Sequence, residues 1–340
     1  GLGKNMRIIL DTMGSDNGAE EFVKAALLAI EELDIDIVLV GREDELKNLV
    51  EKHDKEKIYA KNITILPASE IVTMEDDPVA VMKQKPDSSM LKALRQLADN
   101  KGDAVVSAGN TGALLTMATL VVKRIKGIRR VALGTVIPSD NKPTLLLDCG
   151  ANADCTPEFL QQFAIMGDAY MRAVYQIRKP TIALLNNGAE EHKGSLLYKE
   201  SHQVLKQTDV NFIGNIEARD ILSGVSDVVV MDGFSGNVFL KSVEGMASFF
   251  GRKLKKDFKR NLLSMLSAVA VSGGIKEMKK SFDYTEHGGA PILGAKSVVI
   301  KAHGSSNAKA FYNAIRQAKL FYENDVTQLI ENNIQKPLDE

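Results

Sequence analysis

Residues 103–115 read DAVVSAGNTGALL, and this stretch sets the expected fold class. The valine-rich segment 103–106 predicts a buried strand, because β-branched residues favour strands and polar residues do not alternate with them. Residues 107–112 predict a tight turn, and the apolar residues after it predict a helix. A strand, a short turn and a helix in this order form the repeating unit of an α/β protein.

The same rhythm recurs through most of the chain. Short runs rich in Val, Ile and Leu precede helical patterns, the first at 19–33 and another opening near Glu43. Such runs are typical of strands covered on both faces, so we expect a three-layer α/β/α sandwich with a mainly parallel sheet. About ten strands are many for one sheet, so a second lobe or an antiparallel edge is also expected. The predicted strands are 6–10, 36–40, 63–66, 103–106, 131–137, 144–147, 181–185, 210–213, 227–230 and 297–301.

One segment, 234–280, contains helical patterns only. Residues 237–250 are apolar at helical spacing, and 252–260 read RKLKKDFKR, with six basic residues and one acidic residue. Residues 262–271, LLSMLSAVAV, carry no charge. We predict a helical insert at 237–281 within a single catalytic unit at 6–340. Residues 1–5 precede Met6 and are interpreted as an expression remnant.

Composition excludes several protein classes. Apolar residues make up 44% and charged residues 26%, which excludes a disordered chain, a collagen-like chain and a membrane-spanning bundle. Lys and Arg number 43 against 44 for Asp and Glu, so no global basic excess indicates a nucleic-acid partner. Two cysteines, Cys149 and Cys155, exclude a disulfide scaffold and indicate a reducing, cytoplasmic setting. Neither has zinc-site spacing, and Cys149 is interpreted as structural.

Small polar residues follow six of the predicted strands. Ligands of parallel α/β sheets bind beyond the carboxyl ends of the strands, so we expect these loops to converge on one crevice. The alternative is a set of ordinary turns, in which Gly and Asn are common. The loops are 11–18, 107–112, 148–152, 186–195, 232–237 and 303–307.

Residues 107–115 fit an anion site best. Glycine permits close approach of the backbone to a ligand, and the start of a helix presents free N–H groups and a positive dipole. The alternative is a capped strand–helix turn with no ligand. The stretch lacks the lysine of a Walker A loop, and the dinucleotide fingerprint GxGxxG is absent.

Three cationic candidates follow strands. Lys193, Lys241 and His303 can each neutralise an anion or stabilise developing oxyanion charge. Solvated surface is the alternative for the two lysines, and a structural histidine is the alternative for His303. Asp11 and Asp232 are more typical of helix caps than of catalytic bases.

The basic and apolar residues of the insert leave three possibilities open. They belong to a helix that packs on the body or on a second subunit, to a helix on an anionic membrane, or to a dock for an acidic protein. The candidate contact residues are Arg252, Lys253, Lys255, Lys256, Lys259, Arg260, Leu262, Leu263 and Leu266.

Together these motifs resemble the phosphate:acyl-ACP acyltransferase family (the PlsX family) over essentially the whole chain. The resemblance rests on six motifs in order: ILDTMGSDNG, VSAGNTGALL, LLDCGAN, NNGAEEHKG, VVVMDGFSGNVFLKSVEG and IKAHGSSNAKAF. Ser15 stands where the family usually has a second glycine, and Asp16 keeps its place.

The resemblance implies a fold similar to phosphate acetyltransferases and isocitrate dehydrogenases. It implies that a long-chain acyl group passes from acyl carrier protein (ACP) to inorganic phosphate, for phospholipid synthesis, with no metal or organic cofactor. It also implies a homodimer on the inner face of the membrane, whose product feeds a membrane acyltransferase. The catalytic candidates stay unranked: Lys193, Lys241 and His303. The implied phosphate or substrate residues are Asp11, Gly14, Ser107, Gly109, Asn110, Thr111, Gly112, Asn187, Asp232, Gly233, Ser235, Gly236, Asn237, Gly304 and Ser305.

Three alternatives remain at this point. A phosphate acetyltransferase acting on acetyl-CoA shares the fold and chemistry. A decarboxylating dehydrogenase would need a carboxylate cluster for a divalent metal, and Asp11, Asp148 and Asp232 are dispersed in the sequence. A non-enzymatic lipid or anion-binding scaffold is the third.

Overall fold

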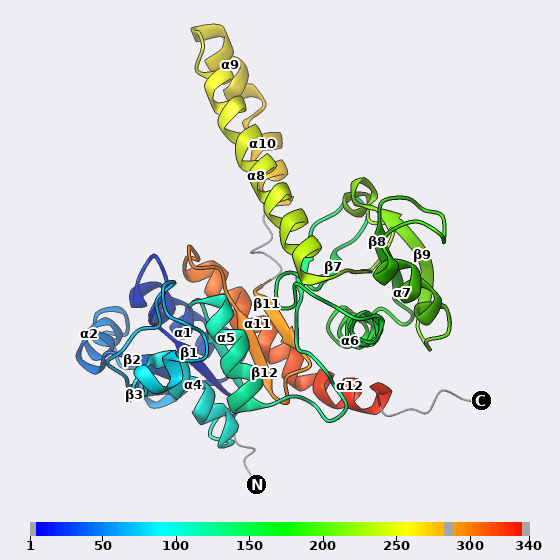
Figure 1. Cartoon of the computed structure of the whole chain (residues 1–340). Coiled ribbons are helices and arrows are strands. Elements are labelled where there is room, and N and C mark those ends of the chain that lie inside the picture. Colours follow the sequence, from blue (N-terminus) through cyan, green and yellow to red (C-terminus); the bar gives the residue numbers. More distant parts are fainter. Residues whose placement is uncertain (1–4, 282–287, 335–340) are drawn as a thin grey trace.

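The computed structural model describes residues 5–281 and 288–334, which form two sheets and a projecting helical arm (Figure 1). The larger sheet has the strand order β3-β2-β1-β4-β12-β11-β5. All of its pairs are parallel except those of β11 with β12 and with β5. Its strands are β1 (Arg7–Asp11), β2 (Asp36–Gly41), β3 (Ile63–Pro67), β4 (Ala104–Ser107), β5 (Ala132–Leu133), β11 (Ala290–Leu293) and β12 (Val298–Lys301).

The smaller sheet has the order β6-β7-β10-β8-β9, and only β6 pairs antiparallel. Its strands are β6 (Thr135–Ile137), β7 (Thr144–Leu147), β8 (Thr181–Asn186), β9 (Asn211–Glu217) and β10 (Val228–Val230). Both sheets are flanked by helices, so the predicted α/β class with mostly parallel strands is confirmed.

One strand prediction was wrong, and one strand was missed. The run 131–137 is not one strand, because the chain changes sheets at Gly134. Leu133 pairs with β11, Thr135 pairs with β7, and a Cβ at Gly134 would lie 3.1 Å from a side-chain carbon of Leu145. Strand β11 was missed, since Pro291 and the preceding glycines are unusual within a strand.

The helices outside the arm cover the two sheets. Helix α1 packs against α11, where Phe22 and Phe311 stack with ring centroids 3.7 Å apart. Helix α6 contacts β7, β8 and β10 of the smaller sheet. These helices are α1 (Ala19–Leu33), α2 (Glu43–His53), α3 (Val81–Gln84), α4 (Ser89–Ala98), α5 (Thr111–Met117), α6 (Pro157–Tyr175), α7 (Leu196–Lys206), α11 (Ala308–Glu323) and α12 (Val326–Ile334).

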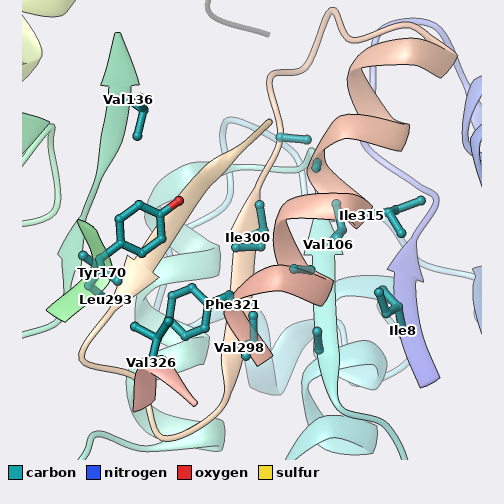
Figure 2. Close-up of a cluster of buried hydrophobic side chains, with 14 of the residues drawn as sticks. Ile8, Val106, Val136, Tyr170, Leu293, Val298, Ile300, Ile315, Phe321 and Val326 are labelled. Carbon is teal, nitrogen blue, oxygen red and sulfur yellow. The ribbon is translucent and has the colours of Figure 1, made fainter. Parts of the chain in front are cut away.

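One hydrophobic core joins the two sheets. The same cluster contains Ile8 and Ile300 of the larger sheet and Val136 and Val228 of the smaller one. Figure 2 shows Tyr170 of α6 near Phe321 of α11, with ring centroids 5.9 Å apart. The shared core fixes the carboxyl ends of the strands of both sheets relative to each other.

The segment predicted to be helical forms the arm seen at the top of Figure 1. It comprises α8 (Gly233–Phe258), α9 (Leu262–Ala270) and α10 (Ser272–Ser281). Of the predicted contact residues, all six basic side chains of the α8 end, Arg252 to Arg260, are exposed, as are Leu263 and Leu266. The side chain of Leu262 lies outside the described part. Within that part, no helix combines the length and apolarity needed to cross a membrane.

Candidate active site

A cavity of about 320 Å³ lies where the two sheets and α8 meet. Four of the six predicted strand-end loops, or the helices that follow them, contribute to its wall, after β4, β7, β10 and β12. Five of the predicted phosphate-binding or catalytic residues line it: Thr111, Gly112, Asn237, Lys241 and His303. The remaining wall comprises Leu133, Thr135, Val136, Cys149, Gly150, Leu240, Glu244, Gly288, Gly289, Ala290, Lys301, Ala302, Ser306 and Ala310.

The β4 loop is a capped strand–helix turn that opens onto this cavity. The Asn110 side chain accepts a hydrogen bond of 2.9 Å from the amide of Ala113 and donates one to the carbonyl of Thr73. Because Asn110 satisfies only one of the first N–H groups of α5, those of Thr111 and Gly112 have no partner within the helix. The start of α5 therefore places positive potential at the wall of the cavity.

The β1 loop supports the cavity without lining it. The amide of Asp16 donates a 2.8 Å hydrogen bond to the carbonyl of Gly304, and the Asn17 side chain donates to the carbonyl of Ser305. Gly14 has φ +93°, and a Cβ there would lie 3.2 Å from the Cα of Gly109. Glycine at this position lets the β1 and β4 loops touch.

The β8 loop lies away from the cavity. Neither Asn187, which is exposed, nor Lys193 lines it. Gly194 and Asn186 close the loop on itself, the Asn186 amide donating to the carbonyl of Lys193. Tyr198, one turn later, donates its hydroxyl to the carboxylate of Asp232, so this loop buttresses the start of α8.

Asp232 and the residues after it seat α8 on the body. The carboxylate of Asp232 accepts bonds of 2.8 Å from both the amide and the hydroxyl of Ser235. A Cβ at Gly236 would lie only 1.9 Å from the carbonyl oxygen of Asp148, so the helix backbone touches the turn after β7. Asp232, Gly233, Ser235 and Gly236 thus orient α8, and its next turn presents Asn237 and Lys241 to the cavity.

Lys241 is an exposed cation already engaged by a neighbour. Its Nζ lies 2.9 Å from a carboxylate oxygen of Glu244, which also lines the cavity. A ligand anion would therefore compete with Glu244 for this ammonium group.

His303 is held by the loop that follows β12. Its Nδ1 accepts a 3.2 Å hydrogen bond from the amide of Ser305 and lies 2.7 Å from the Ser305 hydroxyl. Because Nδ1 accepts, a neutral ring carries its proton on Nε2. Reduced hydration of the ring, followed by the charge of Lys301, lowers the pKa of His303, which favours this neutral form.

Lys301 lines the cavity and was not predicted. It is the last residue of β12, partly buried, and its Nζ donates to the carbonyl oxygens of Ala108, at 3.3 Å, and Ala302. Burial lowers the pKa of Lys301 to about 8, while the charge of Asp11 opposes the shift. The only sequence signal was a lysine ending the apolar run VVIK directly before the His303 loop.

Asp11 lies in a buried polar cluster behind the β4 loop. Its two carboxylate oxygens accept hydrogen bonds from the hydroxyls of Ser89, at 2.5 Å, and Ser107, at 2.6 Å. Burial raises the pKa of Asp11 to about 6, against the lowering effect of these two bonds. Ser89 was not predicted, because it comes from α4 and nothing in the sequence places it beside Asp11.

The other candidate groups have structural partners. Asp148 accepts amide hydrogen bonds from Leu133, Ala151 and Asn152. Burial raises the pKa of both Cys149 and Cys155 to about 12, so neither thiol is a ready nucleophile. Across residues 5–281 and 288–334, no three His, Cys, Asp or Glu side chains are grouped so that they could hold a metal ion.

Comparisons with known proteins agree on one group. A family model described as "Fatty acid synthesis protein" matches residues 6–329. The chain is 46% identical to a phosphate acyltransferase of Thermoanaerobacter pseudethanolicus, over 98% of this chain and 99% of the relative. It is 48% identical to one of Thermoanaerobacterium thermosaccharolyticum, over 97% of each. In fold it is similar to a phosphotransacetylase from Streptococcus pyogenes, with a TM-score of 0.61, 20% identity, and 94% and 95% of the two chains covered.

Proposed function

The chain belongs to the family of fatty acid synthesis proteins whose members include phosphate acyltransferases, and on this premise we propose that it transfers a fatty acyl group from acyl-ACP to inorganic phosphate. The family resemblance read from the six sequence motifs is confirmed, and the chain is an acyltransferase. ACP as the acyl donor is the finer step of the proposal.

One observation carries the proposal: both cationic and apolar side chains line a single cavity. Lys241, Lys301 and the ring of His303 supply groups that suit a phosphate dianion. Leu133, Val136 and Leu240 supply apolar surface on which the first carbons of an acyl chain can lie. The ligands of a phosphate acyltransferase have this double character.

The reaction needs no covalent enzyme intermediate. A phosphate oxygen attacks the thioester carbon, a C–O bond forms, and the carbonyl oxygen becomes an oxyanion. Collapse of this intermediate breaks the C–S bond and releases the ACP thiolate, which takes up one proton. The site must hold the two reactants together and stabilise the negative charge.

The geometry favours two of the three predicted catalytic residues. The neutral ring of His303 carries its proton on Nε2, from which it can donate a hydrogen bond to the oxyanion, and the proton that the thiolate takes up comes from the attacking hydrogen phosphate. Lys241 can stabilise charge at the cavity wall once it leaves Glu244. Lys193 lies outside the cavity, so we assign it, with Asn187, to support of the β8 loop.

We place ACP on the basic end of α8. The segment from Arg252 to Arg260 exposes six basic side chains, four of them on the helix that lines the cavity with Lys241 and two just after its end. Opposite charge accelerates encounter and orients the partners. An acidic carrier bound there would approach the cavity along α8.

We place the membrane at the tip of the arm. Leu263, Leu266 and Val269 of α9 are 75%, 61% and 72% exposed, a large apolar surface for a chain in water. Basic side chains of α8 lie beside this tip and suit anionic lipid head groups. A peripheral position of this kind would bring the acyl phosphate to a membrane acyltransferase.

We propose that the shaft of α8 packs against a second copy of the chain. Met246, Phe249 and Phe250 are 55%, 53% and 57% exposed there. A homodimer through this surface would shield apolar side chains that lie below the membrane-facing tip.

A thiol-release assay tests the function. Acyl-ACP incubated with the enzyme should release free ACP thiol only when phosphate is present. Replacing acyl-ACP by acetyl-CoA tests the phosphate acetyltransferase alternative, which the fold neighbour supports. Equal or faster turnover of acetyl-CoA would favour that alternative, whereas the exposed apolar arm favours the long-chain substrate.

A further inference from the structure

We propose that Lys301 is the principal residue that binds the phosphate dianion, and this inference rests on the function proposed above. It assigns the anion site to the end of β12, between the start of α5 and the start of α11. Lys301 lies within the motif IKAHGSSNAKAF, but the sequence alone did not mark it as a candidate.

The ammonium group of Lys301 is fixed in place. Two of its three protons point to the carbonyl oxygens of Ala108 and Ala302. The side chain is partly buried and lines the cavity, so the third proton remains for a ligand. Anchoring by backbone carbonyls positions the charge without neutralising it.

Lys301 differs in this respect from three partly buried lysines that pair with carboxylates. Lys85, Lys92 and Lys142 lie 2.6, 2.6 and 2.7 Å from the carboxylates of Asp76, Asp87 and Asp227. Among the described residues no carboxylate forms an ion pair with Lys301. A partly desolvated cation without a counterion is costly, and a bound anion removes that cost.

The surrounding charges keep the ammonium group available. From β1 and its loop, Asp11 and Asp16 stabilise its charge, whereas Lys241 of α8 opposes it. His303, the thiol of Cys149 and Glu244, which pairs with Lys241, are the other ionisable groups that line the cavity. Asp11 is held by two serine hydroxyls, so it acts at a distance and leaves Lys301 free to bind an external anion.

Glycines border the cavity beside Lys301. Gly288 and Gly289 line it just before β11, whose Ala290 pairs with Lys301, and a Cβ at Gly289 would lie 2.7 Å from the carbonyl oxygen of Lys301. Glycine lets the two backbones approach closely there. Ser306 lies just before α11, and Asn307 caps that helix by accepting from the amide of Ala310. Thr111 and Ser306 add two hydroxyl groups to the cavity wall that Lys301 also lines.

Binding of inorganic phosphate alone, measured by calorimetry at pH 7.5, tests the assignment. We expect Lys301→Met to weaken phosphate binding by about tenfold to a hundredfold, the range for loss of a hydrogen bond to a charged group. Lys296→Met is the matched control, because Lys296 is an exposed lysine of the same β11–β12 hairpin. It should bind phosphate as the wild type does.

The acyl donor is tested in a separate arm. Phosphate affinity unchanged in Lys301→Met would overturn the assignment, and so would a defect confined to acyl-ACP binding, which would place the acyl donor there. Thermal unfolding with and without phosphate checks folding, and Lys301→Gln repeats the test if the methionine variant is unstable. Since no acyl donor is used in the phosphate titration, failure of acyl transfer by the wild type would count against the proposed function alone.

Discussion

Asp11 and Lys301 lie at the same level of the larger sheet, one on each side of Ser107. Both are in register with Ser107 of β4, so their Cα atoms are about 10 Å apart across two strand spacings. Ser107 donates its hydroxyl to Asp11, and Lys301 donates to the carbonyl of the next residue, Ala108. A buried anion and a cavity-lining cation are thus coupled through one strand.

This coupling predicts an alkaline limit to phosphate binding. The pKa of Lys301 is about 8, so its positive charge is present below this pH and is lost as the pH rises through it. Phosphate affinity of the wild type should therefore fall about tenfold per pH unit above 8. Calorimetry from pH 7 to 9.5 measures this fall. Lys301→Arg stays charged, so its phosphate affinity should not fall above pH 8. The same fall in the arginine variant would mean that another group causes it.

Asp11→Asn should move that limit to lower pH. The ionised carboxylate stabilises the charged form of Lys301, so its removal lowers the pKa of Lys301 further. Because the pKa of Asp11 is about 6, the carboxylate is ionised at pH 7.5 and the variant removes a real charge. We expect a several-fold loss of phosphate affinity at pH 8 and little loss at pH 6. If phosphate affinity depended on pH in the same way in the variant and the wild type, the coupling between Asp11 and Lys301 would be contradicted.

Gly236→Ala should disrupt the seat of α8. The added Cβ would lie 1.9 Å from the carbonyl oxygen of Asp148, and neither backbone can yield cheaply. We expect the free energy of unfolding to fall by more than about 2 kcal/mol, in line with overpacking. Gly251→Ala is the control, because nothing lies within 4 Å of its Cβ and alanine favours helix. Urea unfolding that ranks the two variants equally would refute the close contact.

Charge reversal on the arm should affect the carrier and spare phosphate. Lys253→Glu combined with Lys256→Glu should raise the KM for acyl-ACP several-fold at low salt and leave the KM for phosphate unchanged. Lys199→Glu, an exposed position on α7, is the control. Added salt should shrink the difference between variant and wild type. Equal effects on both KM values would argue against docking of ACP at this segment.

Leu263→Asp should release the protein from anionic vesicles. The residue is 75% exposed at the arm tip, and a carboxylate there opposes both insertion and the lipid charge. Leu196→Asp, 71% exposed on α7, matches it in chemistry and exposure away from the arm. Co-sedimentation should drop for the first variant only. Unchanged sedimentation of Leu263→Asp would remove the arm tip from the membrane contact.

Periodicity predicted the class of fold, and the strand-end pattern predicted four of the loops that contribute to the cavity wall. Both failed where the position of a residue depends on contacts with residues distant in the sequence. The apolar run 131–137 divides at Gly134, because the residues before it pair with β11 and those after it pair with β7. No local sequence pattern indicates these pairings. Lys301 looked like the end of a strand, and its role as a cavity cation comes from packing against Ala108.

Loops with similar composition also proved different. The β4 loop lines the cavity, whereas the β8 loop with Lys193 supports α8 through Tyr198 and Asp232. Gly and Asn occur in both loops, so these residue types alone could not separate binding from support. The distinction arises from strand order, which places β8 one strand farther than β10 from β7.

The most direct test of the account follows both products of one reaction. Wild-type enzyme, palmitoyl-ACP and phosphate labelled with ¹⁸O are incubated, and free ACP thiol and acyl phosphate are quantified by mass spectrometry. The account predicts equal amounts of the two products, with label in the bridging oxygen and no thiol released without phosphate. Thiol release that continues without phosphate, with free fatty acid as the product, would contradict it.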